Sequence, residues 1–118
     1  MARNSNRMLE AVAKMTSVLQ ACASITVTYA QGFEVRAGIA ATPGRTPYEI
    51  LEGGVVVPYE SHDFAIAVVL LDGLTPKSGD IITDDTTGRK FVVSMPGKMN
   101  VYESFQGIAY KIHTKAVT

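Results

Sequence analysis

Residues 75–95, TPKSGDIITDDTTGRKFVVSM, and residues 101–115, VYESFQGIAYKIHTK, decide the fold class. In the first stretch, two runs of branched and aromatic residues flank the polar turn sequence DDTTG, which is typical of a β-hairpin. In the second stretch, every other residue from Ile108 to Ile112 is large and hydrophobic. That period of two predicts a closing strand.

A second hairpin is predicted earlier in the chain, at residues 25–40. Ile25, Val27 and Tyr29 alternate with threonines, as in a half-buried strand. After a turn at Gln31 and Gly32, the run FEVRAGIA at 33–40 alternates in the same way. The two runs are expected to pair.

A third hairpin is predicted where YEIL at 48–51 and VVVPYE at 55–60 flank the sequence EGG. Gly53 and Gly54 are expected to supply the positive φ angles that a tight turn requires. Pro58 lacks an N–H group, so its strand is expected to be short or to lie at an edge.

The apolar run FAIAVVLL at 64–71 has the length and the branched residues of a buried strand. Pro76 and Gly79 then indicate a loop, with Gly79 at positive φ. Short strands with Gly and Pro turns throughout predict a mainly β fold, a small closed or nearly closed antiparallel β-barrel.

One helix is expected to precede the strands. Between residues 7 and 22 the apolar side chains recur at steps of four and three, which predicts an amphipathic helix. The stripe consists of Met8, Val12, Met15, Leu19 and Cys22. It is expected to pack either on its own barrel or on another subunit. We therefore expect a single domain over 1–118, with the helix in 1–24 and the barrel in 25–118.

Composition limits the function. The chain has 118 residues, 47% of them hydrophobic, with 11 basic and 11 acidic side chains that give a formal net charge of zero. A globular fold is expected, because disordered chains are less hydrophobic and more charged. Sequence-independent binding to nucleic acid needs excess basic charge, so only weak DNA binding is expected. The longest apolar run is too short for a membrane-spanning helix.

No pattern of catalytic or metal-ligating residues stands out. Ser61 precedes His62 and Asp63, but neighbouring strand residues point to opposite faces, so Ser61 or Asp63 is expected to bond loop backbone instead. TPGRT at 42–46 lacks the lysine of a phosphate-binding loop. Asp80, Asp84 and Asp85 lack the spacing of a calcium loop. We expect no enzyme activity, no cofactor and no metal.

The segment 95–107, MPGKMNVYESFQG, is predicted to be an extended loop with too much apolar surface to stay uncovered. It either folds over the barrel mouth or packs on an adjacent protomer. Its candidate contact residues are Met95, Met99, Tyr102 and Phe105.

Over residues 25–115 the order of elements resembles the head-tail joining proteins of tailed bacteriophages, of the stopper or head-completion type. The resemblance is carried by ESHDFAI at 60–66, PKSGDII at 76–82, the hairpin, FVV at 91–93, the aromatic loop and YKIHTK at 110–115. Two features depart from the pattern, because the aromatic loop lacks a tryptophan and DDTTG is slightly long. These departures leave the type of connector open.

The resemblance implies a structural subunit of the virion neck, assembled in the host cytoplasm. It implies a homo-oligomeric ring around the genome channel, between the portal-side adaptor and the tail-terminator or tail protein. A tail or baseplate subunit is the near alternative. An oligonucleotide-binding barrel, in which aromatic side chains stack on single-stranded bases, is a more distant one.

Overall fold

The computed structural model describes residues 25–117. The helix predicted over 7–22, with the stripe Met8, Val12, Met15 and Leu19, lies outside the described residues. In the part that is described, no helix is long and apolar enough to cross a membrane.

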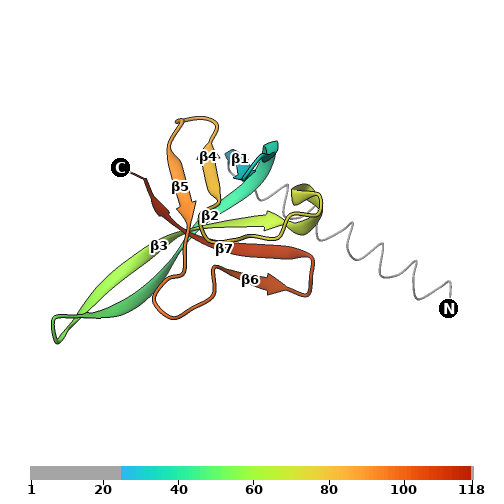
Figure 1. Ribbon diagram of the computed structural model, residues 1–118. Coiled ribbons are helices and arrows are strands. Elements are labelled where there is room, and N and C mark those ends of the chain that lie inside the picture. Colours follow the sequence, from blue (N-terminus) through green and yellow to red (C-terminus); the bar gives the residue numbers. More distant parts are fainter. Residues whose placement is uncertain (1–24, 118) are drawn as a thin grey trace, which may run out of the picture.

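Seven antiparallel strands form one curled sheet (Figure 1). They follow the order β3-β2-β1-β4-β5-β7-β6, and β3 also pairs with β7, so the sheet closes into a nearly complete ring. This confirms the mainly β fold and all three predicted hairpins. The elements are β1 Ile25–Gln31, β2 Glu34–Glu52, β3 Val55–Ala67, the 3-10 turn η1 Val68–Leu71, β4 Ile81–Asp84, β5 Lys90–Val93, β6 Tyr102–Phe105 and β7 Ala109–Ala116.

The hydrophobic core lies inside the curled sheet. Every strand except β6 contributes to it, and η1 adds one leucine. This distribution explains why distant segments of the sequence hold one another in place, since burial of apolar area is the main favourable term in folding. The core residues are Val27, Tyr29, Ile39, Ala41, Phe64, Ile66, Leu71, Ile82, Phe91, Val93 and Ile112.

The alternation at the start of β2 does not mark a buried face. Phe33 and Val35 are exposed, whereas Ile39 further along the strand is buried. The register with β1 shifts between these segments, so that two β2 residues face the single β1 residue Thr28. Such a β-bulge changes the side to which the following residues point.

The strand predicted over 64–71 is wrong in its second half. β3 ends at Ala67, and Val68–Leu71 form η1. The Val68 N–H bonds the carbonyl of Ile108, and the chain then turns at Asp72, which has the left-handed φ of 46°. Leu71 still becomes fully buried, so the apolar run serves the core as a strand followed by a turn.

β2 and β3 are longer than the sequence suggested. Beyond the sheet they pair only with each other and form a projecting two-stranded hairpin, residues 46–60, which we call the arm (Figure 1). Its turn contains Gly53 and Gly54, with φ of 56° and 82°. Pro47 and Pro58 fit here because each strand of the arm has one unpaired edge.

The segment 95–107 is not a loop throughout. Residues Tyr102–Phe105 form β6, which pairs with Ala109–Ile112 of β7. Gln106 and Gly107 make the turn between the two strands, both at positive φ. Because β7 is fixed between β3 and β6 over this stretch, the second half of the segment is part of the sheet.

Candidate functional site

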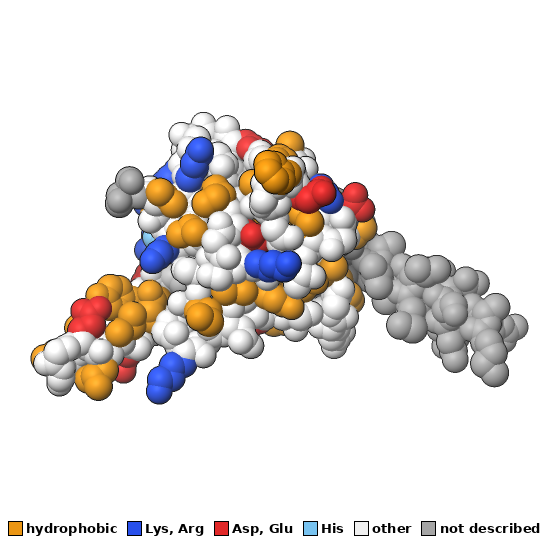
Figure 2. Space-filling view, in the orientation of Figure 1, with side chains coloured by type: hydrophobic (Ala, Val, Ile, Leu, Met, Phe, Trp, Pro, Cys, Tyr) orange, Lys and Arg blue, Asp and Glu red, His pale blue; other side chains and the backbone are white. Residues whose placement is uncertain are grey.

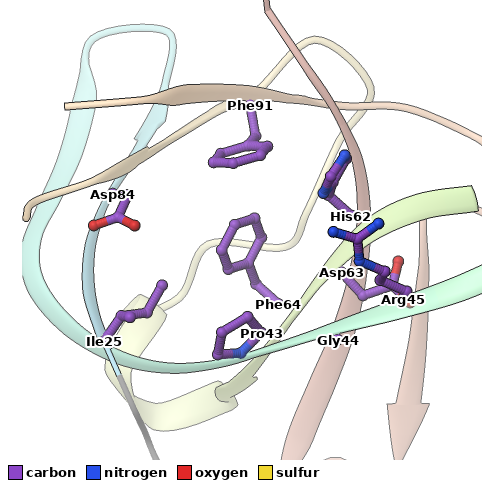
Figure 3. A pocket seen from close by; sticks show the side chains of 9 residues that line it. All are labelled: Ile25, Pro43, Gly44, Arg45, His62, Asp63, Phe64, Asp84 and Phe91. Carbon is purple, nitrogen blue, oxygen red and sulfur yellow. The ribbon is translucent and has the colours of Figure 1, made fainter. Parts of the chain in front are cut away.

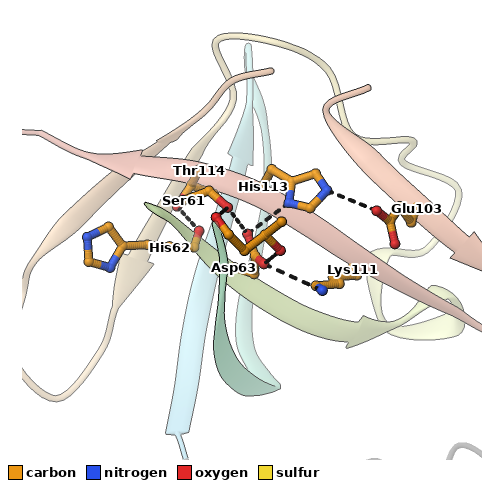
Figure 4. A network of polar contacts seen from close by, with 8 residues as sticks. Ser61, His62, Asp63, Glu103, Lys111, His113 and Thr114 are labelled. Atoms are coloured by element: carbon orange, nitrogen blue, oxygen red, sulfur yellow. Dashed lines mark hydrogen bonds and ion pairs between the residues drawn. The ribbon is translucent and has the colours of Figure 1, made fainter. Parts of the chain in front are cut away.

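A buried polar network joins β2, β3 and β7 (Figure 4). At its centre the Asp63 carboxylate accepts hydrogen bonds from Ser61 Oγ at 2.6 Å, from His113 Nδ1 at 2.8 Å and from Thr46 Oγ1. Lys111 Nζ lies 3.8 Å from the same carboxylate. The predicted bond to loop backbone is therefore wrong: Ser61 and Asp63 are buried in the middle of a strand, and the backbone group that Ser61 Oγ reaches, at 3.4 Å, is the Thr46 carbonyl of β2.

The hydrogen bonds of the network connect β2, β3 and β7 through one ionised carboxylate. Burial would raise the pKa of Asp63, but the hydrogen bonds from Ser61, Thr46 and His113 outweigh it and hold this pKa below its ordinary value. Ser61 and His113 both donate to Asp63, so the serine hydroxyl is not paired with a base. A serine nucleophile needs a base that takes its proton, so this arrangement does not meet that requirement for acyl transfer.

A second carboxylate, Asp80, fastens the loop after η1. It accepts hydrogen bonds from Tyr29 Oη, from Gln31 Nε2 at 2.9 Å and from the Lys77 N–H at 2.8 Å. Burial, together with the bond to Asp80, raises the pKa of Tyr29 well above its ordinary value. Within residues 25–117 no group of three or more acidic, histidine or cysteine side chains is placed to hold a metal ion.

A hollow of about 250 Å³ opens beside Phe91 (Figure 3). The ring of Phe91 meets Phe64 edge to face at 5.1 Å and lies 5.5 Å from the His62 ring. Burial, with Arg45 and Arg89 nearby, lowers the pKa of His62. The hollow has an aromatic wall. Of the charged side chains that line it, Arg45 is paired with Glu60 at 3.2 Å, and Asp84 accepts a hydrogen bond from the Thr86 N–H at 2.9 Å.

The arm carries a group of exposed apolar side chains. Apolar side chains run along it where it projects from the sheet (Figure 2). Leu51 is 70% exposed, Val55 62% and Val56 56%, and Tyr59 is also exposed. Single exposed apolar residues are common, whereas a contiguous exposed apolar group is typical of contact sites.

Both faces of the arm are apolar. Residues that are directly opposite in an antiparallel pair point to the same side. Ile50 opposite Val57 lies on one face, next to the stacked pair Tyr48 and Tyr59, whose ring centroids are 5.7 Å apart. Leu51 opposite Val56 lies on the other face. Strands with apolar side chains on both faces are normally covered on both sides.

A groove of about 700 Å³ runs along the β2 strand of the arm. One wall is the β2 stretch from Tyr48 to Leu51, and the other is the segment from Met95 to Met99. A Cβ at Gly97 would lie 3.6 Å from the Tyr48 ring and 3.6 Å from the Glu49 carbonyl oxygen, so the two walls approach each other closely here. Met95 is 60% exposed here and Met99 is half-buried.

The four residues predicted as contacts in 95–107 do not form one group in the structure. Met95 and Met99 line the groove, and Met95 also lines a second hollow together with Tyr102. Tyr102 packs edge to face on Tyr110, with ring centroids 4.8 Å apart, and Phe105 is exposed at the end of β6. Among the turn residues, Pro76 is buried and Gly79 has a φ of 95°.

Sequence reasoning did not select the arm as a candidate contact surface. It identified the hairpin and its glycines, but it treated the valines of 55–57 only as residues of a strand. The signal was present in the sequence, because large apolar residues fall on both faces of EILEGGVVVPYE, 49–60. An ordinary solvent-facing hairpin alternates apolar and polar residues instead.

Comparison with known families gives the identity. The family model of the phage head-tail joining protein matches residues 5–118, which include all seven strands. No curated protein sequence matches the chain. The match confirms the resemblance seen in the order of elements. It extends over nearly the whole sequence, and this chain therefore belongs to the phage head-tail joining protein family, as a structural protein of the virion.

Proposed function

We propose that the chain is the subunit of a homo-oligomeric ring in the virion neck. The ring lies between the portal-side adaptor and the tail protein, and the genome passes through its centre. The observation that carries the proposal is the arm, a two-stranded ribbon with apolar side chains on both faces and, among residues 25–117, no other strand beside it. An isolated two-stranded hairpin is marginally stable in water, so the arm needs a cover.

The family supports the location, and the arm supports the assembly. A structural joint acts through contacts with neighbouring proteins, and methionine and aromatic side chains are favoured anchors at such contacts. Met95, Met99 and Tyr59 supply anchors of this kind near the arm. The apolar stripe Met8, Val12, Met15 and Leu19, predicted from the sequence, is a further candidate contact, as are Tyr102 and Phe105.

Two measurements test this function. In the first, the native mass of the purified chain is determined by mass spectrometry, and a discrete multiple of 12.7 kDa above the dimer is expected. In the second, the chain is added to phage heads that lack it, together with tails, and joined particles are counted by electron microscopy.

The controls for the joining assay are heads and tails without the chain, and heads that already contain it. We expect joined particles only where the chain is present. Full joining in its absence, or no joining when it is added in excess, would exclude a role in the neck.

A further inference from the structure

We propose that the edge strand β6 is fastened to the sheet by a proton on His113 Nε2, which donates a hydrogen bond to Glu103. β6 is the last strand in the order of the sheet, and among the described strands it pairs with β7 alone. Without the proton, β6 keeps only its backbone pairing and its side-chain packing. This device lies within one copy of the chain and does not depend on the proposed ring.

The His113 ring lies between two carboxylates that belong to different strands (Figure 4). Its Nδ1 is 2.8 Å from Asp63 Oδ1 on β3, and its Nε2 is 3.6 Å from Glu103 Oε1 on β6. The ring is fully buried, and Nε2 has no hydrogen-bond partner within residues 25–117. Buried polar atoms are nearly always hydrogen-bonded. The Glu103 side chain is 49% exposed, so it is free to rotate the short remaining distance toward Nε2.

The ionised carboxylate of Asp63 decides which nitrogen of the ring carries the first proton. Asp63 stays ionised at neutral pH because its pKa lies below its ordinary value. An ionised carboxylate only accepts hydrogen bonds, so the ring donates to it from Nδ1. In a neutral imidazole, Nε2 is then an acceptor, and it faces a second acceptor, the Glu103 carboxylate. A second proton, on Nε2, turns this repulsive contact into a charge-assisted hydrogen bond.

The charges around the ring favour the second proton. Asp63 from β3 and Glu103 from β6 are negative, and Lys111 of β7 is positive, with its Nζ 3.8 Å from the Asp63 carboxylate. Lys111 is also directly opposite Glu103 in the pairing of β7 with β6. With a neutral imidazole these groups sum to one negative charge, and with an imidazolium they sum to zero. Buried charges are tolerated when they are paired, so the balanced state is the more favourable one.

The other polar side chains near the ring do not change this balance. The His62 ring points away from the network and packs on Phe91, with 5.5 Å between the ring centroids (Figure 4). Lys98, from the segment before β6, lines the groove along the arm. Besides the central carboxylate, β2 and β3 bring only the neutral hydroxyls of Thr46 and Ser61 to the network. The charge at the ring is therefore set by the three groups named above.

The bond to Glu103 matters because β6 has few other attachments. Four residue pairs join the strand to β7, and Tyr102 packs on Tyr110. A hollow of about 690 Å³ lies along β6, lined by Met95 and residues 100–104, so there is space into which the strand can move. The fastened strand binds one proton more than the released strand, so the fastening weakens as the pH rises. Ordinary imidazoles change charge between about pH 5 and pH 8, and this is the range to be tested.

Hydrogen exchange on the full chain, read by NMR, tests the device. The protection factors of the amides that join β6 to β7 are compared at about pH 5.5 and about pH 7.5, with the amide of Ile66 as the internal reference. We expect the protection of the β6 amides to fall by at least about 10-fold at the higher pH, as for the loss of one hydrogen bond to a charged group, while that of Ile66 stays constant. The nitrogen shifts of the His113 ring should show protons on both nitrogens at the lower pH and on Nδ1 alone at the higher pH.

Glu103→Gln is the critical variant, and the exposure of this side chain makes it compatible with folding. A glutamine donates an N–H to the neutral Nε2, and its oxygen accepts from the protonated ring, so the protection of β6 should lose its pH dependence. Two controls should keep the pH dependence of the parent chain. His62→Gln removes the other histidine, and Glu49→Gln makes the same charge change at an exposed glutamate of the arm.

Three results would overturn the proposal. The first is equal protection of β6 at both pH values in the parent chain. The second is a His113 ring that carries no proton on Nε2 at the lower pH. The third is a Glu103→Gln variant that responds to pH like the parent.

Discussion

The closed part of the sheet and the arm contain similar apolar residues, which are buried in the first and exposed in the second. In the second half of β3, Phe64 and Ile66 are buried, because this stretch pairs with β2 on one side and β7 on the other. In the first half of the same strand, Val55 and Val56 are exposed, because it pairs with β2 alone. Burial is thus decided by what lies beside the strand and not by its own composition.

The difference has an energetic meaning. The closed part of the sheet surrounds a core to which six strands contribute, so each core side chain stabilises the folded monomer. The arm extends about 20 Å from Thr46 to Glu52, at roughly 3.4 Å per residue, without any such core. Its apolar side chains are expected to contribute to assembly and very little to folding. The five predictions below test this division.

The largest effect is expected in the core. Ile112 is fully buried in β7, between Phe64 on β3 and Tyr102 on β6. Ile112→Ala removes buried methyl groups and leaves a cavity, so it should lower the free energy of unfolding by about 2 to 5 kcal/mol. Urea unfolding of the dilute chain measures this. A loss below about 1 kcal/mol would mean that the closure between β3 and β7 contributes little.

The second effect concerns the network that fastens the base of the arm to β7. The pKa of Asp63 in the folded chain lies below its ordinary value of about 4, so the unfolded chain binds the extra proton first as the pH falls. Stability from this group is present above about pH 4 and is lost as the pH falls through the folded-state pKa.

The matching variant is Asp63→Asn, which keeps the shape and removes the titration. It should cost about 1 to 3 kcal/mol at pH 7, as expected when buried donors lose a charged acceptor, and its loss of stability on acidification should be smaller than that of the parent. Unfolding curves between pH 3 and pH 7 measure both. Parallel pH profiles of the two chains would show that Asp63 is not the group responsible.

The third effect is conformational. Gly79 has a φ of 95°, and a Cβ at this position meets no atom within 4 Å. Gly79→Val should therefore cost about 1 to 2 kcal/mol from backbone strain alone. Gly44→Val is the control, because Gly44 also faces open space and its φ is not in the positive region. Equal thermal midpoints for the two variants would contradict this explanation.

The fourth effect divides two aromatic residues of one short strand. Tyr102 packs on Tyr110, whereas Phe105 is 52% exposed. Tyr102→Ser should cost about 1 kcal/mol or slightly more in the monomer, as for the loss of an aromatic pair. Phe105→Ser should leave stability within about 0.5 kcal/mol of the parent. The reverse order in chemical unfolding would place Phe105 in the core.

Much of this fold was accessible from the sequence. Alternation at Val27 and Tyr29 and the glycine turns at 53 and 54 predicted the hairpins correctly, because these signals are local. The length of β2 was missed, since Pro43 and Gly44 look like loop residues. They are tolerated in the strand because β2 has already left β1 and needs no N–H donor on that edge.

The exposed apolar surface was harder to predict than the fold. Met95, Met99, Tyr102 and Phe105 were grouped from the sequence as residues of one loop, whereas the structure places Met95 and Met99 along the groove and Tyr102 and Phe105 on β6. Two of the hydrogen-bond partners of Asp63, Thr46 and His113, are 17 and 50 residues away from it in the sequence. No local pattern contains such pairings.

The smallest effect on the monomer is expected in the arm. Val55→Ser with Val56→Ser removes two exposed side chains, so the unfolding free energy of the dilute chain should change by less than about 0.5 kcal/mol. Amide exchange should show the same division: the arm amides exchange within a brief pulse in the dilute parent chain, while those of Ile66 and Ile112 are protected. In the assembled parent the arm should become protected, and in the serine variant at the same concentration it should not. Strong protection of the arm in the dilute parent chain would mean that the monomer stabilises it without a partner, and the contrast between the closed part of the sheet and the arm would then fail.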